Sequence, residues 1–230
     1  MRNRGFSNIE MVLAFVIFIS AVVFAVYILF LGKNAIGSDK DLQNIILNIE
    51  KNVSTEVVVY PVLIKGVLVN KILAINLSVE NSNNVAVINL SDNNILSEVS
   101  DGVVYFDSLG SGNSFKIMLS KDIINNNNIA NKPSIQHENY TIGPAIRYLL
   151  LSEKRVKILN ASYYLDYDSL RRKFSSSKDF LFSVYLKDKI IANASIIVPS
   201  SSSVYRFSEN KEFLTEEGLR KFGKIEVSVW

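Results

Sequence analysis

The side chains that most often carry enzymatic chemistry are scarce in this chain. It has no cysteine and a single histidine, His137, among its 230 residues. Disulfides, thiolate catalysis and cysteine metal sites are therefore excluded, and a metal site with two histidines cannot form. His137 lies in a polar stretch with no nucleophile pattern beside it, so we interpret it as a solvated loop residue. The sequence predicts no catalytic residue, no metal ion and no cofactor, and we do not expect an enzyme.

Three further groups of residues in the sequence could bind a ligand: a glycine-rich segment, a pair of acids and a basic run. The segment 110–112, Gly-Ser-Gly, lacks the third glycine and the strand–helix context of a dinucleotide-binding loop. Asp166 and Asp168 are too few ligands for a cation, and helix capping is the preferred interpretation, with Asp168 as the cap of a short helix over 169–174. The basic run 171–173 with Lys178 could touch anionic lipid head groups or glycans, although a solvated helix face is more common.

Six Asn-x-Ser/Thr motifs could accept N-linked glycans in an exported protein. Asparagine is abundant, so composition alone accounts for about three such motifs, and both interpretations stay open. The six asparagines are Asn52, Asn76, Asn89, Asn139, Asn160 and Asn193.

The strongest signal is an apolar segment near the N-terminus. Residues 11–31 carry no charge, whereas Arg2 and Arg4 precede them. A helix of this length rises about 31 Å, which matches the hydrocarbon core of a bilayer at about 30 Å. The positive charges before it predict a cytoplasmic N-terminus and an exported remainder. The expected localisation is the cell membrane, with a single pass and an extracellular head.

Three interpretations compete for this segment. A cleaved secretory signal has a shorter apolar region and a small-x-small site, and the only late candidate site here is the weak one at 35–37. A plain signal anchor would leave the segment uncleaved. The third interpretation depends on the residues immediately before the apolar run, Arg4-Gly5-Phe6-Ser7-Asn8-Ile9-Glu10.

This heptapeptide resembles the class III signal peptide of type IV pilins and of their archaeal and pseudopilin relatives. That family has a short basic leader ending in glycine, a hydrophobic first mature residue and a glutamate at the fifth mature position. The resemblance implies cleavage between Gly5 and Phe6, with Arg2 and Arg4 as the leader charges. Asn8 stands where bacterial major pilins usually have leucine, and the apolar run lacks their kinking proline. An archaeal pilin-like protein or a minor pilin is therefore the closer match.

The physical chemistry of this segment agrees with the resemblance. Cleavage would place a new ammonium on Phe6, one helical turn from Glu10. A carboxylate entering an apolar helix bundle is costly unless it is paired, and in the family it meets the N-terminal amine of a neighbouring subunit. The plainer alternative is that Glu10 sits at a membrane interface.

The resemblance also implies a set of partners. They are the membrane, a prepilin peptidase, other pilin-like subunits, and an assembly ATPase with its platform protein, serving a surface filament or a secretion or adhesion apparatus. The alternative function is a single-pass, membrane-anchored extracellular binding protein that does not polymerise. The net charge of +3 is too mild to predict a nucleic-acid partner.

After a polar break at 32–38, the segment 39–53 is predicted to form an amphipathic helix that Ser38 or Asp39 could cap. Its apolar positions recur with helical spacing at Leu42, Ile45, Ile46, Ile49 and Val53.

From residue 56 onward, short β-branched or aliphatic runs predict strands, and Pro61 predicts a strand edge or a bend. Two hairpins are expected, one with strands 146–151 and 156–165 and one with strands 180–186 and 190–198. Further strands are expected at 57–64, 66–77, 85–90, 103–107, 115–119 and 224–230.

The expected fold class is α+β: a long N-terminal transmembrane helix followed by a mainly antiparallel, sandwich-like β head. The asparagine-rich stretch 125–141 predicts a boundary within the head. The expected parts are a leader at 1–5, a transmembrane or filament-core helix at 6–31, a helix extension and linker at 32–55, and head halves at 56–124 and 142–230.

Overall fold

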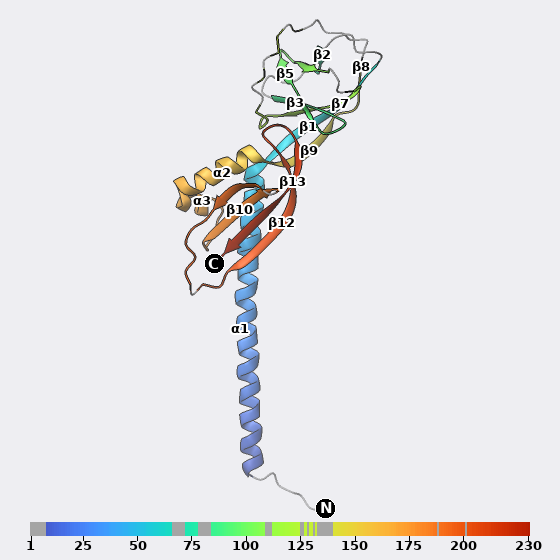
Figure 1. Cartoon of the computed structure of the whole chain (residues 1–230). Coiled ribbons are helices and arrows are strands. Elements are labelled where there is room, and N and C mark those ends of the chain that lie inside the picture. Colours follow the sequence, from blue (N-terminus) through green and yellow to red (C-terminus); the bar gives the residue numbers. More distant parts are fainter. Residues whose placement is uncertain are drawn as a thin grey trace, which may run out of the picture.

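A computed structural model gives the fold, and it shows a long helix that carries a β-rich head (Figure 1). Side chains 8–10 and 28–40 of the helix are outside the described part. The residues described are 8–65, 72–77, 84–108, 112–124, 127, 129–130, 132, 140–187, 189–200 and 202–230.

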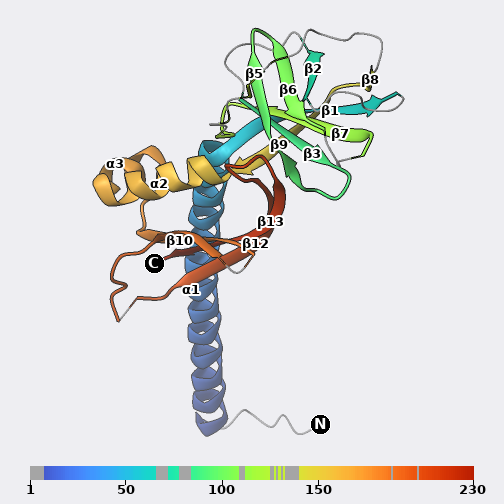
Figure 2. The ribbon, with the colours of Figure 1, turned by 45° about the horizontal axis from the view of Figure 1, so that its top comes forward.

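The long helix, α1, is Asn8–Val53 and runs without interruption for 46 residues. The predicted polar break at 32–38 is wrong, because the backbone stays helical through it. The N-terminal part of α1 extends away from the head as a lone stem, and its C-terminal part lies along the head (Figures 1 and 2). The predicted apolar stripe is confirmed, since all five of its residues are buried: Leu42, Ile45, Ile46, Ile49 and Val53.

Ten of the strands in the described residues form one continuous sheet, in the order β11-β10-β13-β12-β9-β1-β7-β3-β4, with β8 also paired to β1. Every pairing is antiparallel except the short parallel contact of β9 with β12. The bounds are β1 Ser54–Ile64, β3 Asn84–Asn89, β4 Asn94–Ile95, β7 Ser114–Ser120, β8 Tyr140–Ile142, β9 Ile146–Ser152, β10 Phe180–Leu186, β11 Lys189–Ala194, β12 Tyr205–Leu214 and β13 Arg220–Val229.

A second sheet of three strands, in the order β2-β6-β5, covers part of the large sheet. Its strands are β2 Ile72–Asn76, β5 Ser97–Ser100 and β6 Val103–Asp107. Ile75 and Phe106 pack with Val87 and Ile117 of the large sheet in one apolar cluster. The rings of Phe106 and Phe115 lie 5.0 Å apart.

The largest core lies where α1 crosses the C-terminal strands. Strands β10 to β13, helix α2 (Glu153–Leu165) and helix α3 (Tyr167–Lys173) contribute buried side chains to a cluster that includes the α1 stripe. Among them, Phe182 and Val227 are fully covered. This core fixes the direction in which the stem leaves the head.

The expected fold class is wrong on two counts. Within the part of the chain described, no helix is long and apolar enough to cross a membrane. The chain is mostly β, and a curled sheet with nine strands along its main path replaces the expected sandwich. A sheet this wide twists and curls because each strand rotates relative to its neighbour.

The predicted strand at 156–165 is also wrong, because these residues belong to helix α2. The hydroxyl of Ser152 accepts a hydrogen bond from the backbone N–H of Arg155 and caps the helix. Val156, Leu159 and Tyr163 are buried at helical spacing. The apolar residues that were predicted to form the buried face of a strand therefore form the buried face of a helix.

Pro61 lies inside β1, not at a sheet edge. On one side β1 pairs with β7, and on the other it pairs with β9 up to Val59 and with β8 from Val62. Pro61 falls where the second partner changes, and its carbonyl accepts a hydrogen bond from the N–H of Gly143. A proline, which has no N–H to donate, fits this gap in the ladder.

The second predicted hairpin is confirmed as β10 and β11, and the last strand as β13. Ile225, Val227 and Val229 of β13 are all buried, as their alternation predicts. Strand β12 had no counterpart in the prediction. It is paired with β13 along its whole length.

Candidate functional site

The stem of α1, defined here as residues 11–27, projects from the head (Figure 1), and every one of its residues is exposed, so it presents apolar side chains on every side. Exposed fractions of its large apolar residues run from 43% at Val22 to 65% at Phe15. These residues are Met11, Val12, Leu13, Phe15, Val16, Ile17, Phe18, Ile19, Val22, Val23, Phe24, Val26 and Tyr27. Exposed apolar surface on this scale marks an interaction site.

The stem offers almost no polar group to a partner. The residues from 11 to 27 include no charged side chain. The hydroxyl of Ser20 donates to the carbonyl of Val16 one turn earlier, so it is satisfied within the helix. Burying one large apolar side chain is worth about 1.5–3 kcal/mol, so covering the stem with apolar surface would release a large free energy. What the stem can do chemically is therefore association, not catalysis.

The head holds the other half of α1 by polar contacts as well as by packing. The ammonium of Lys211 on β12 lies 3.0 Å from the carboxylate of Glu50. The amide of Asn48 donates to the carbonyl of Phe174, just after α3, at 3.3 Å. The hydroxyl of Ser177 donates to the carboxylate of Asp41 at 3.1 Å. These contacts hold residues 41–50 of α1 against the head.

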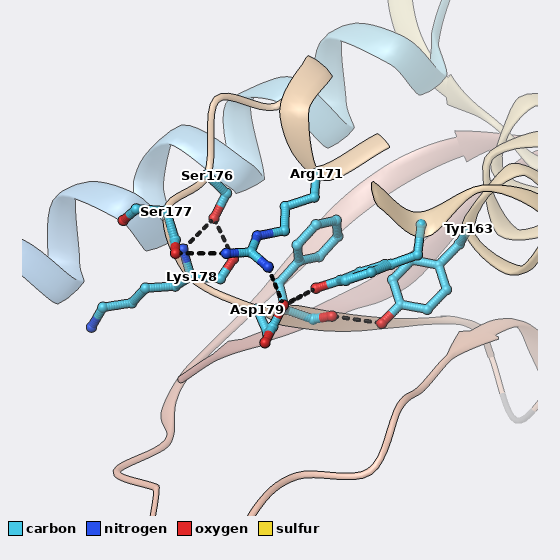
Figure 3. Close-up of polar contacts among 8 residues, drawn as sticks. Tyr163, Arg171, Ser176, Ser177, Lys178 and Asp179 are labelled. Atoms are coloured by element: carbon cyan, nitrogen blue, oxygen red, sulfur yellow. Dashed lines mark hydrogen bonds and ion pairs between the residues drawn. The ribbon is translucent and has the colours of Figure 1, made fainter. Parts of the chain in front are cut away.

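Close to α1, a polar network fastens α3 to the segment that leads into β10 (Figure 3). Arg171 donates one hydrogen bond to the carboxylate of Asp179 and another to the carbonyl of Ser177, each at 2.9 Å. The hydroxyl of Tyr167 donates to the same carboxylate of Asp179 at 3.0 Å. The hydroxyl of Tyr163 donates to the carbonyl of Phe180 at 2.6 Å. Burial raises the pKa of Tyr167 to about 12, so this hydroxyl stays a hydrogen-bond donor over the physiological range.

The basic cluster 171–173 is only partly the solvated face that its sequence suggests. Arg171 is bound to Asp179, whereas Arg172 is exposed. The ammonium of Lys178 lies 5.2 Å from the ring centroid of Tyr205, a cation–π distance. The sequence did not indicate this network, because residues 156–165, which include Tyr163, were predicted to form a strand.

Most of the predicted processing and assembly residues lie outside the described residues: Arg2, Arg4, Gly5 and Phe6. Glu10 has a helical backbone within α1, but its side chain is outside the description. His137 and Gly110 also lie outside the described residues.

The six predicted glycosylation sites occupy different environments, and Asn139 lies outside the described residues. Asn76 and Asn193 are exposed. Asn52 is half-buried, and its amide donates to the carbonyl of Asn48. Asn89 uses its side-chain oxygen to accept from two backbone N–H groups of the following turn. Asn160 is half-buried, and its side-chain oxygen is sealed from solvent.

Comparison with known proteins identified no relative of this chain. No protein-family model, no curated protein and no solved structure matches the chain. The features of this chain that bear on function are therefore the stem, the head that holds it and the N-terminal residues of the sequence.

Proposed function

We propose that this chain is a type IV pilin-like subunit of a cell-surface filament, or of a secretion or adhesion apparatus, that assembles through its apolar N-terminal helix. The observation that carries the proposal is the stem: part of one continuous helix, apolar on every side, that projects from a folded head. Apolar helices of this kind lower their free energy by packing on one another. Other copies of this chain, or related subunits, are the proposed partners.

The sequence before the stem supports the same proposal. A prepilin peptidase would cut between Gly5 and Phe6, and the new ammonium would lie one turn from Glu10. In the assembled filament, Glu10 would pair with the ammonium of a neighbouring Phe6, which removes the cost of an unpaired carboxylate among apolar helices. An assembly ATPase and its platform protein would drive the process.

The head supports the proposal by the way in which it holds α1. The C-terminal part of the helix is embedded in the head through the buried stripe around Ile45 and Ile49. The residues from 11 to 27 are all exposed, so this part of α1 is free to pack with other subunits while the heads form an outer face.

The first test concerns processing and uses the native host. N-terminal sequencing of the mature protein should find Phe6 as the first residue, and Gly5→Leu should leave the leader attached. Recovery of mature wild-type protein that still begins at Met1 would contradict the proposal.

The second test concerns assembly and compares two exposed apolar positions. Phe15→Lys places a charge in the stem, and Leu90→Lys places one on the head at a similar exposure, 65% against 73%. A buried, unpaired lysine is costly, so we expect Phe15→Lys to reduce filaments at least tenfold in electron micrographs. Leu90→Lys should leave their number within twofold. Equal numbers for the two variants would argue against assembly through the stem.

A further inference from the structure

A hollow on the head lies where α1, α2 and α3 meet, away from the stem. Its volume is about 390 Å³, within the range of small-molecule sites at about 300–1,000 Å³. The apolar part of its lining comes from Ile158, Leu159 and Leu165 on α2 and from Leu170 on α3. Ile158 is 57% exposed, so a ligand would cover apolar surface that the fold leaves open.

The ammonium of Lys173, at this hollow, has no acidic partner among the described residues. The ammonium of Lys173 donates to the side-chain oxygen of Asn52 at 2.7 Å. Among the residues described, no carboxylate lies within ion-pair distance of Lys173. An ammonium carries three donors, so two remain for a ligand.

The other charges around the hollow set the charge of that ligand. Arg155 is already engaged, because it donates to Asp122 and to the carbonyl of Ser54, each at 2.6 Å. The carboxylate of Asp166 also lines the hollow and would repel a second negative charge. With one free cation and one acid among the described residues that line the hollow, the site suits a monoanion better than a phosphate dianion.

We propose that this hollow binds a small aliphatic carboxylate. Its carboxylate pairs with the ammonium of Lys173, and its apolar tail lies against Ile158, Leu159 and Leu170. The site is independent of the filament proposal, because none of these residues belongs to the stem.

The test follows the isoleucine methyl signals of the full-length protein by NMR, in a non-ionic detergent, during a titration with hexanoate. Ile158 reports on the hollow, whereas Ile17 and Ile19 report on unspecific partition onto the stem. We expect a saturable shift at Ile158 and none at Ile17 or Ile19. Hexanol and hexylammonium, which lack the negative charge, should bind at least fivefold more weakly.

Two variants and a control establish the role of the charge. Lys173→Met should weaken hexanoate binding at least fivefold, whereas Arg172→Met, the neighbouring exposed cation outside the hollow, should leave it unchanged. Asn52→Asp should also weaken binding, because the new carboxylate occupies the ammonium while the lysine remains. The proposal is overturned if the stem signals move with Ile158, if hexanol binds as tightly as hexanoate, or if Lys173→Met behaves like Arg172→Met.

Discussion

At the scale of single residues, the most consequential contact is the one that Arg155 makes. Its guanidinium joins the start of α2 to the segment after β7 through Asp122 and to the start of β1 through the Ser54 carbonyl. The side chain of Asp122 is only 10% exposed, so its carboxylate depends on this partner. Another arginine, Arg147, pairs with Glu56 at a similar distance, but both side chains are more than half exposed.

These two ion pairs allow a matched test of burial. Arg155→Met should lower the free energy of unfolding by about 1–3 kcal/mol, because it leaves a buried carboxylate without its hydrogen bond. Arg147→Met should lower it by about 0–1 kcal/mol, because the exposed pair is solvated and screened. Urea unfolding of the full chain at pH 7 measures both. Equal losses would mean that the Asp122 contact is not formed in solution.

At the scale of elements, the junction between helices α2 and α3 shows why the helix cap was predicted at the wrong residue. Asp166 ends α2 and caps α3, and its side chain accepts a hydrogen bond from the N–H of Ser169 at 2.9 Å. Asp168, the cap predicted from the sequence, lies inside the first turn of α3 instead. Both acids satisfy the general pattern of a helix start, so only the backbone conformation decides between them.

The cap assignment predicts different costs for two neighbouring substitutions. Asp166→Ala should lower the free energy of unfolding by about 1 kcal/mol, the usual cost of losing an N-cap. Asp168→Ala removes only a favourable charge near the helix start, for about 0.3 kcal/mol. Thermal unfolding followed by circular dichroism compares the two. If Asp168→Ala proves the more damaging, the cap has been placed wrongly.

At the scale of the whole molecule, the turn between β12 and β13 joins the C-terminal strands to the first half of the head. The amide of Asn94 donates to the carbonyl of Glu217 at 2.6 Å, and the N–H of Ile124 donates to that of Glu216 at 2.8 Å. At Gly218, an added Cβ would lie 2.2 Å from the Cβ of Ala86 on β3. The turn is therefore packed directly against the far side of the sheet.

This close approach predicts the cost of a substitution at the turn. Gly218→Ala should destabilise the chain by about 1 kcal/mol for its positive φ and by about 1–3 kcal/mol more for overpacking against Ala86. Gly112→Ala is the control, because Gly112 has a similar φ of +80 with nothing within 4 Å of the added Cβ. It should show only the first cost. Urea unfolding measures the free energy of unfolding of both variants. Equal losses for Gly218→Ala and Gly112→Ala would mean that the turn is not packed against β3.

The sequence by itself determined those helices and strands that can be recognised from the residues of one short segment. The buried stripe of α1, the strand at Val103–Asp107, the β10–β11 hairpin and the alternation of β13 all follow from the spacing of apolar residues. These patterns are reliable because each apolar run lies within one element, so no distant partner is needed to recognise it.

The tertiary structure decided the secondary structure and strand pairing of segments whose local sequence is compatible with more than one conformation. The run from Val156 to Leu165 is apolar enough for a strand, but Ser152 caps it as a helix and Tyr163 buries its face against β10. Strand β12 is recognised only through its partner β13, and Pro61 is tolerated only because β8 and β9 leave a gap beside it. Such pairings join residues far apart in the chain, so no local period encodes them. The hollow beside Lys173 has the same origin, because three helices from two regions of the sequence meet there.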